Sequence, residues 1–141
     1  MYNILLSAIF SILLLSPSSS TDIIMHINTN LDTHNRIIVS KELTDIIKNN
    51  RDNLYILDIR KSEDFQAGHI PGAINHLWNG IETTQKTLPK DKIIVVYCYT
   101  GKTANKLVEI LSNQGYNVFS LEGGWLKGWI PFIYNTNCKH T

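Results

Sequence analysis

Short apolar runs and helically spaced apolar residues alternate along most of this chain. Five runs are typical of buried strands, because each is short, mostly apolar and bounded by polar or turn residues. They cover residues 36–39, 54–59, 73–75, 93–97 and 117–121. The run at 93–97, Ile-Ile-Val-Val-Tyr, is the clearest, since most of its residues are β-branched. The pattern therefore predicts five strands.

Helical spacing separates these runs. Apolar residues within 43–47 share one face of a predicted helix that Ser40 can cap. From residue 104 to 111 apolar residues recur at i, i+3, i+4 and i+7, and Gly115 is placed to end that helix. Two further stretches are predicted as short helices, residues 81–86 ahead of Pro89 and residues 125–129.

Strands that alternate with helices predict an α/β fold. Such βαβ units build a doubly wound parallel sheet, here of about five strands, with helices on both faces. A chain of 141 residues, 43% of them hydrophobic, holds enough apolar material for one core. Because ligands of these sheets bind beyond the carboxyl ends of the strands, candidate chemistry is sought there.

The first twenty residues differ in kind from the rest. Segment 4–15 is almost entirely apolar, Pro17 and a run of serines follow it, and no charged side chain comes before Asp22. This pattern is typical of a secretory signal that is cleaved near Ser20, and it is shorter than the about 20 residues of a membrane span. We expect an exported, periplasmic or secreted protein; an uncleaved segment would instead anchor the chain to a membrane.

Composition excludes several classes of function. The 13 Lys and Arg residues against 12 Asp and Glu residues leave a formal net charge of +1, which gives no field for nucleic acid. The two cysteines and five histidines show no zinc spacing, and no glycine pattern of a nucleotide site is present. We expect a small partner, no metal and no cofactor.

The strongest candidate for chemistry is Cys98, which directly follows the clearest strand. If residues 99–103 curl back over the strand end, the amides of Tyr99, Thr100, Gly101, Lys102 and Thr103 can converge above the sulfur. The dipole of the following helix and the charge of Lys102 favour the thiolate. The alternative is a buried structural cysteine at a strand end.

A second candidate group follows the strand at 54–59. Asp58 and Arg60 leave the same face of that strand and can pair near the rim of a pocket, or form a plain salt bridge. His69 lies on a constrained turn, Gly-His-Ile-Pro-Gly-Ala, at residues 68–73. We favour a structural role for His69 over that of a general base.

A third segment, Leu-Glu-Gly-Gly-Trp at residues 121–125, follows the last strand. A double glycine lets the backbone come close to a neighbouring segment. The tryptophans at 125 and 129 are most simply core residues.

With these segments together, the chain resembles the single-domain members of the rhodanese-like sulfurtransferase family. We place the domain at residues 36–133, ahead of a polar tail at 134–141. The matching pieces, in family order, are Asp58-Ile59-Arg60-Lys61-Ser62-Glu63-Asp64-Phe65, Gly68-His69-Ile70-Pro71-Gly72-Ala73-Ile74-Asn75, Tyr97-Cys98-Tyr99-Thr100-Gly101-Lys102-Thr103-Ala104 and Leu121-Glu122-Gly123-Gly124-Trp125.

The resemblance implies that Cys98 carries a sulfane sulfur as a persulfide. Residues 99–103 would bind the donor, a small sulfur-containing anion or thiol such as thiosulfate, and Asp58, Arg60 and His69 would support the site. The acceptor would be cyanide or another thiol. Tyr99 stands where many family members have arginine, so a natural donor other than thiosulfate or a larger anion stays open.

Loop length separates this prediction from related folds that hydrolyse phosphate esters. Those folds use a longer loop that ends in an arginine, which grips phosphate oxygens. Here the position five after Cys98 is Thr103, and no arginine follows Arg60. The spacing argues against a phosphatase or arsenate reductase.

Two alternatives stay open. The chain can be a binding module without catalysis, although such domains usually lack the cysteine that this loop retains. It can also be a thiol-redox module that uses Cys98 with or without Cys138 of the polar tail, which could pair with Cys98 in an oxidising compartment. For Cys138 itself we favour a free tail thiol without a role.

The export hypothesis has a direct test. N-terminal sequencing of the protein from the periplasm or medium should begin near residue 21. An intact Met1 on protein in a soluble cytosolic fraction would contradict it.

Overall fold

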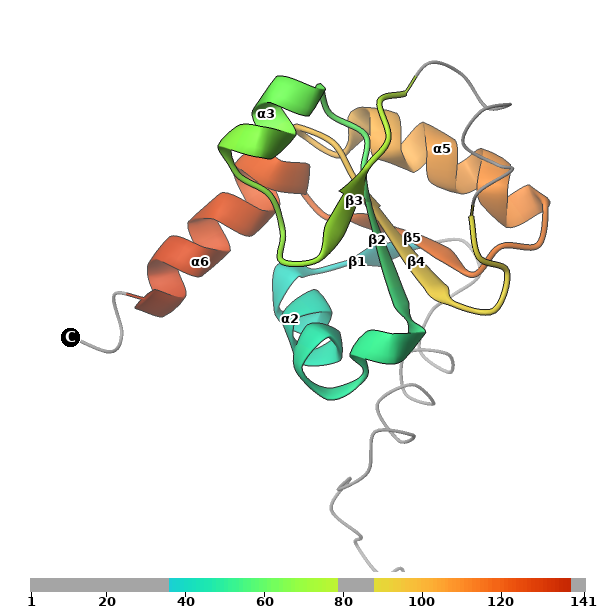
Figure 1. The fold of residues 1–141 in the computed structure, drawn as a ribbon, viewed down its shortest axis with the longest axis horizontal. Coiled ribbons are helices and arrows are strands. Elements are labelled where there is room, and N and C mark those ends of the chain that lie inside the picture. Colours follow the sequence, from blue (N-terminus) through green and yellow to red (C-terminus); the bar gives the residue numbers. More distant parts are fainter. Residues whose placement is uncertain (1–35, 79–87, 138–141) are drawn as a thin grey trace, which may run out of the picture. The chain divides into compact units, whose positions relative to one another are not determined.

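A computed structural model describes residues 36–78 and 88–137 (Figure 1). Within these ranges five strands form one sheet in the order β1-β5-β4-β2-β3, and every neighbouring pair is parallel. The strands are β1 (Ile37–Ile38), β2 (Leu54–Asp58), β3 (Ala73–Asn75), β4 (Ile93–Tyr97) and β5 (Val118–Leu121). The predicted strands and the predicted doubly wound parallel sheet are confirmed.

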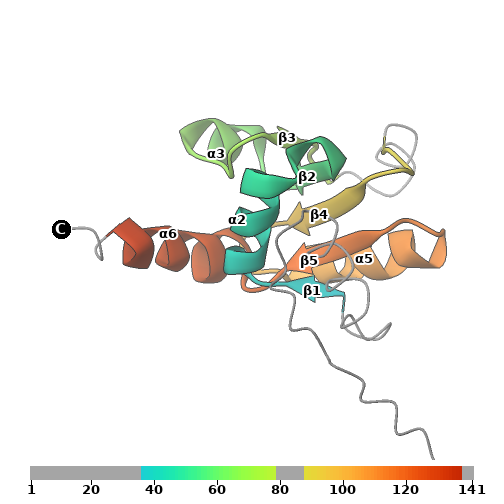
Figure 2. The ribbon, with the colours of Figure 1, turned by 90° about the horizontal axis from the view of Figure 1, so that it is seen from below.

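Helices flank this sheet on both sides. Figure 1 shows α2 and α5 on opposite sides of the strands, and Figure 2 shows the same arrangement from below. The helices are α2 (Ser40–Asn49), α3 (Ser62–Ala67), α5 (Lys102–Asn113) and α6 (Ile130–Asn137), with the short turns η1 (Arg51–Asn53) and η2 (Gly124–Trp129). No helix within the described ranges is long and apolar enough to cross a membrane.

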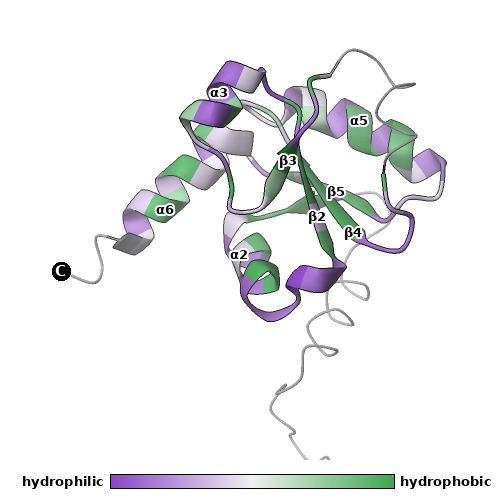
Figure 3. Ribbon diagram, in the orientation of Figure 1, coloured by the Kyte–Doolittle hydropathy of each residue, from purple (hydrophilic) through white to green (hydrophobic). Residues whose placement is uncertain are grey.

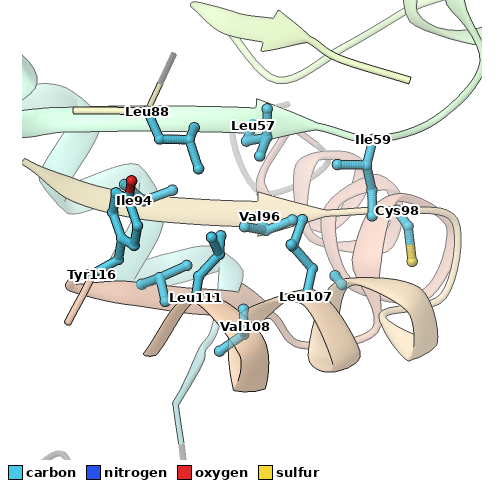
Figure 4. Close-up of a cluster of buried hydrophobic side chains, with 12 residues drawn as sticks. Leu57, Ile59, Leu88, Ile94, Val96, Cys98, Leu107, Val108, Leu111 and Tyr116 are labelled. Carbon is cyan, nitrogen blue, oxygen red and sulfur yellow. The ribbon is translucent and has the colours of Figure 1, made fainter. Parts of the chain in front are cut away.

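One cluster of buried apolar residues lies between the sheet and α5, and Leu43 and Ile46 of α2 are buried as well. Every residue of β4 is buried, as expected of a central strand covered on both faces. Figure 3 shows the hydrophobic strands inside and hydrophilic residues on the outer sides of the helices. Leu57 and Val96 are partners in register and pack against Leu107 and Leu111 of α5 (Figure 4).

The strand order places the carboxyl ends of β2 and β4 side by side. From β2 the chain moves outward to β3, and it then returns to place β4 and β5 on the other side of β2. Such a reversal is the position where open α/β sheets bind ligands. In register, Asp58 is the partner of Tyr97, so residues that follow either strand lie at one edge of the sheet.

The end of α5 follows the predicted pattern. Gly115, with a φ of 81°, stands just past the helix, where left-handed backbone favours glycine. Its N–H donates to the carbonyl of Ser112, and the N–H of Tyr116 donates to that of Leu111. These two bonds satisfy carbonyls that the helix leaves without partners.

The predicted cap of the first helix is wrong by one residue. The helix α2 begins at Ser40, and Val39 holds the cap position. The N–H of Val39 donates to a carboxylate oxygen of Glu42 at 3.2 Å. The Ser40 hydroxyl is buried and has no hydrogen-bond partner among the described residues. β1 ends at Ile38, so the chain turns into the helix one residue earlier than a serine cap requires.

The helix α3 was not predicted from the sequence. Its six residues are too few to show helical spacing of apolar side chains. Two features of the sequence are nevertheless typical of a helix here. They are the acidic residues of the first turn, Glu63 and Asp64, and Gly68 directly after the last helical residue.

The last helix is longer than predicted. η2 is a π-helical turn, in which the N–H of Ile130 donates to the carbonyl of Trp125, and it leads directly into α6. α6 therefore includes residues 134–137, which we had placed in a polar tail. The sequence Tyr-Asn-Thr-Asn at these positions gives no apolar periodicity from which to predict a helix.

Three predictions lie outside the described residues. They are the export signal at 1–20, the helical stretch at 81–86 and the position of Cys138.

Candidate active site around Cys98

Cys98 directly follows β4 and lies beside the first turn of α5 (Figure 4). It is a free cysteine and 5% exposed. The backbone N–H of Gly101 donates a hydrogen bond to Sγ at 3.2 Å. A donor aimed at the sulfur stabilises negative charge on it. The cysteine is therefore placed for anion chemistry as well as for packing.

Gly101 makes this contact possible. Its φ of 90° lies in the left-handed region, which glycine enters without steric cost, and it precedes the first residue of α5. The chain thus reverses within residues 99–101, so that the N–H points back at the sulfur. The first amides of a helix have no partners within it, and their end of the helix carries partial positive charge.

The residues predicted to bind the donor lie in the loop after Cys98 and in the first turn of α5. Tyr99, Thr100 and Gly101 form the loop, and Lys102 and Thr103 begin α5 with exposed side chains. In the described part of the chain, the hydrogen bond to Sγ comes from the Gly101 amide. Convergence of the other four amides on a ligand stays a prediction.

The segment after β5 holds the loop through backbone hydrogen bonds. The N–H of Trp125 donates to the carbonyl of Cys98, and the N–H of Leu126 donates to that of Tyr99, both at 2.9 Å. Two successive carbonyls of the loop are thus bound by one turn, η2. The orientation of the loop therefore depends on the position of that turn.

Gly124 allows η2 to come this close. A β-carbon at Gly124 would lie 2.5 Å from the carbonyl oxygen of Cys98 and 2.8 Å from the amide nitrogen of Gly101. Real side chains do not tolerate such distances, so this position requires glycine. The close backbone approach predicted from the double glycine is confirmed.

Asp58 and Arg60 form the predicted pair, and it is buried. Their side chains are 0% and 2% exposed, and Nη2 of Arg60 lies 2.7 Å from Oδ2 of Asp58. The same Nη2 donates to the carbonyl of Gly68 at 2.7 Å. Burial alone lowers the pKa of the Arg60 guanidinium, but the hydrogen bonds and charge of Asp58 outweigh burial, and the pKa is raised. Arg60 therefore stays charged inside the protein.

Three aromatic rings surround this guanidinium. The Cζ atom of Arg60 lies 4.4 Å from the ring centroid of Trp125, 5.4 Å from that of Tyr97 and 5.9 Å from that of Tyr99. The ring faces attract the cation. Burial, together with a hydrogen bond to Asp58, raises the pKa of Tyr97, which therefore stays neutral. Arg60 is thus enclosed by the protein and connects β2 to the Cys98 loop.

His69 is not part of this arrangement. It is exposed, its ring stacks on Phe65 at 4.0 Å, and its Nδ1 lies 2.9 Å from the Phe65 carbonyl oxygen. None of its contacts within the described structure is with Cys98. The geometry supports the structural role that we favoured.

Sequence reasoning missed two side chains beside the loop. Trp125 was predicted as a core residue, but it is half-buried and covers Arg60. Asp64 accepts a hydrogen bond from the hydroxyl of Tyr99, a contact between residues far apart in the chain. The only sequence signal for this contact was the pair of acidic residues in the first turn of α3. Within the described residues no group of three His, Cys, Asp or Glu side chains could hold a metal ion.

Comparison with known proteins agrees with this geometry. The model of the rhodanese-like domain family matches residues 39–130. The chain belongs to the rhodanese-like family. The crystal structure of a rhodanese-related protein from Thermoplasma volcanium superposes with a TM-score of 0.61 at 31% identity, over 69% of this chain and 92% of that one. The predicted resemblance is confirmed.

Curated relatives of this rhodanese-like protein are sulfurtransferases by name. The putative sulfurtransferase YtwF of Bacillus subtilis is 32% identical over 75 residues, which are 53% of this chain and 73% of that protein. The tRNA sulfurtransferase of Desulfurococcus amylolyticus is 38% identical over 69 residues, 49% of this chain but only 14% of that protein. The match therefore covers most of the first relative and a small part of the second.

The backbone contact at Gly124 predicts a position-specific loss of stability. Gly124→Ala should lower the free energy of unfolding in urea by about 2–5 kcal/mol, the sum of left-handed strain and overpacking. Gly115→Ala is the matched control, since its φ is also positive but nothing lies within 4 Å of the added carbon. It should cost only about 1–2 kcal/mol. Equal losses in the two variants would show that the contact is unimportant.

Proposed function

We propose that this rhodanese-like protein is a sulfurtransferase that carries a sulfane sulfur as a persulfide on Cys98. The observation that carries the proposal is the hydrogen bond from the Gly101 amide to Sγ, at the start of a twelve-residue helix. A persulfide is an anion that extends from this sulfur. The loop amides and the helix N-terminus are suited to stabilise it without a metal or cofactor.

The proposed cycle has two displacements at sulfur. The Cys98 thiolate attacks the outer sulfur of thiosulfate, the sulfur–sulfur bond of the donor breaks, and its electron pair leaves with sulfite. The new bond makes Cys98 a persulfide. A nucleophile such as cyanide or a thiolate then attacks the outer sulfur, which it takes as thiocyanate or a new persulfide, and the Cys98 thiolate is restored.

The size and charge of the loop support a small sulfur donor. Only residues 99–101 separate Cys98 from α5, and so short a loop favours a small ligand at the sulfur. Lys102, exposed in the first turn of α5, can attract an anionic donor. Arg60 cannot take this role, because Asp58 and the aromatic rings already enclose it.

A persulfide on Cys98 should increase the mass of the protein, and the increase should require Cys98. After incubation with thiosulfate, intact-protein mass spectrometry should show the gain of one sulfur atom, which cyanide then removes. Cys98→Ser should show no gain. A native protein that gains no sulfur from thiosulfate or from cysteine persulfide would falsify the proposed activity and favour a binding module.

The proposed role of Lys102 predicts that its removal changes the KM for the donor and not kcat. Lys102→Ala should raise the KM for thiosulfate about twofold to fivefold, since an exposed ion pair contributes up to about 1 kcal/mol, and should leave kcat nearly unchanged. The increase should shrink at high salt, because salt screens exposed charges. Lys106→Ala, which removes an exposed lysine one turn further along α5, is the control. Equal effects of both substitutions would contradict a specific role for Lys102.

A further inference from the structure

The side chain of Tyr99 is bound to another helix. Its hydroxyl donates a hydrogen bond to Oδ2 of Asp64, which lies in the first turn of α3. This bond is the main reason why the pKa of Tyr99 is raised, and burial and the charge of Asp64 raise it further. The backbone N–H of Lys61 and the charge of Arg60 lower the pKa, but by less. The phenol therefore stays protonated and able to donate at neutral pH.

Tyr99 is held on its backbone as well. Its carbonyl accepts the N–H of Leu126, while its ring lies 5.9 Å from the Arg60 guanidinium. The residue directly after Cys98 is thus bound by η2 on one side and by α3 on the other. Of the remaining loop residues, Thr100 is exposed and Gly101 has no side chain. Tyr99 therefore provides the side-chain anchor of the loop.

We propose that the Asp64–Tyr99 hydrogen bond positions the Cys98 loop for sulfur uptake, which makes Tyr99 and Asp64 positioning residues. The proposal rests on the proposed sulfurtransferase function. The Gly101 amide must point at the sulfur within a narrow range of angle and distance to stabilise its charge. Residues 99–101 belong to no helix or strand, so their conformation depends on such anchors.

The position of Asp64 supports this role. α3 also provides the Phe65 carbonyl that His69 contacts, and Gly68, just past its end, accepts a hydrogen bond from Arg60. α3 is therefore connected to the buried ion pair as well as to the loop. A hydrogen bond to such a fixed element restrains Tyr99, whereas a bond to a mobile surface group would not.

The test compares four single variants and one double variant. Tyr99→Phe keeps the ring but removes the hydroxyl, and Asp64→Ala removes the acceptor. Asp64→Asn retains an oxygen that accepts the hydroxyl and should restore function. Glu63→Ala removes an exposed neighbouring charge from the same turn of α3 and is the matched control. The double variant joins Tyr99→Phe with Asp64→Ala.

Two measurements are made on each full-length variant. The first is the rate of sulfite release from thiosulfate in a single turnover. The second is amide hydrogen exchange of the peptide that spans residues 98–103, which requires no sulfur chemistry. Thermal unfolding identifies the fraction of folded protein.

In the expected result, Tyr99→Phe and Asp64→Ala each slow sulfite release about threefold to tenfold, as for the loss of one hydrogen bond. Exchange in the loop becomes faster by a similar factor. The double variant is no slower than the slower single variant, because both changes remove one interaction. Asp64→Asn and Glu63→Ala stay within about twofold of the native protein.

Two outcomes would overturn the proposal. One is unchanged loop exchange in Tyr99→Phe, and the other is a double variant whose effect is the product of the two single effects. Variants that unfold at lower temperature but keep both rates would show that the bond only stabilises the fold. If the native protein takes up no sulfur, the proposed function fails, and the exchange measurement still decides whether the bond orders the loop.

Discussion

The buried ion pair between Asp58 and Arg60 is the interaction on which the surroundings of Cys98 depend. Both side chains are almost fully removed from water, which costs several kcal/mol per ion unless each charge is matched. Asp58 provides that match, and the Gly68 carbonyl binds a further N–H of the guanidinium. An unpaired charge cannot remain in this buried position, so Arg60 must keep its contacts. These contacts hold β2, the turn after α3 and the aromatic rings together.

The rings above Arg60 connect this pair to Cys98. Trp125 covers the guanidinium, while its backbone N–H binds the carbonyl of Cys98. Tyr97, the last residue of β4, lies beside the same cation on the face opposite to Cys98. The last residue of β4 and the residue after it thus face opposite ways, since alternation along extended backbone sends the phenol to the ion pair and the thiol toward α5.

The contacts that hold the Cys98 loop are made mainly by backbone groups. Its amide at Gly101 meets the sulfur, its carbonyls are bound by η2, and Gly124 lies against it at a distance that excludes any side chain. Backbone groups are well suited to hold a sulfur anion because they stabilise charge without themselves titrating. In the function proposed above, the nearby side chains of Tyr99 and Lys102 act on the orientation of the loop and on the approach of the donor.

The central strands, the helix α5 and the position of Cys98 could be predicted from the sequence alone, because each depends on local residue patterns. Hydrophobic runs at 93–97 and 54–59 determined the central strands, and residue spacing determined α5, the position of Cys98 at a strand end and the Asp58–Arg60 pair. What only the tertiary structure decided were contacts between distant segments. α3 is too short to show periodicity, and Ser40 lost its predicted cap because β1 ends one residue too early. The bond from Tyr99 to Asp64, and the cover of Trp125 over Arg60, join residues whose proximity depends on strand register and on the packing of η2, which local sequence does not encode.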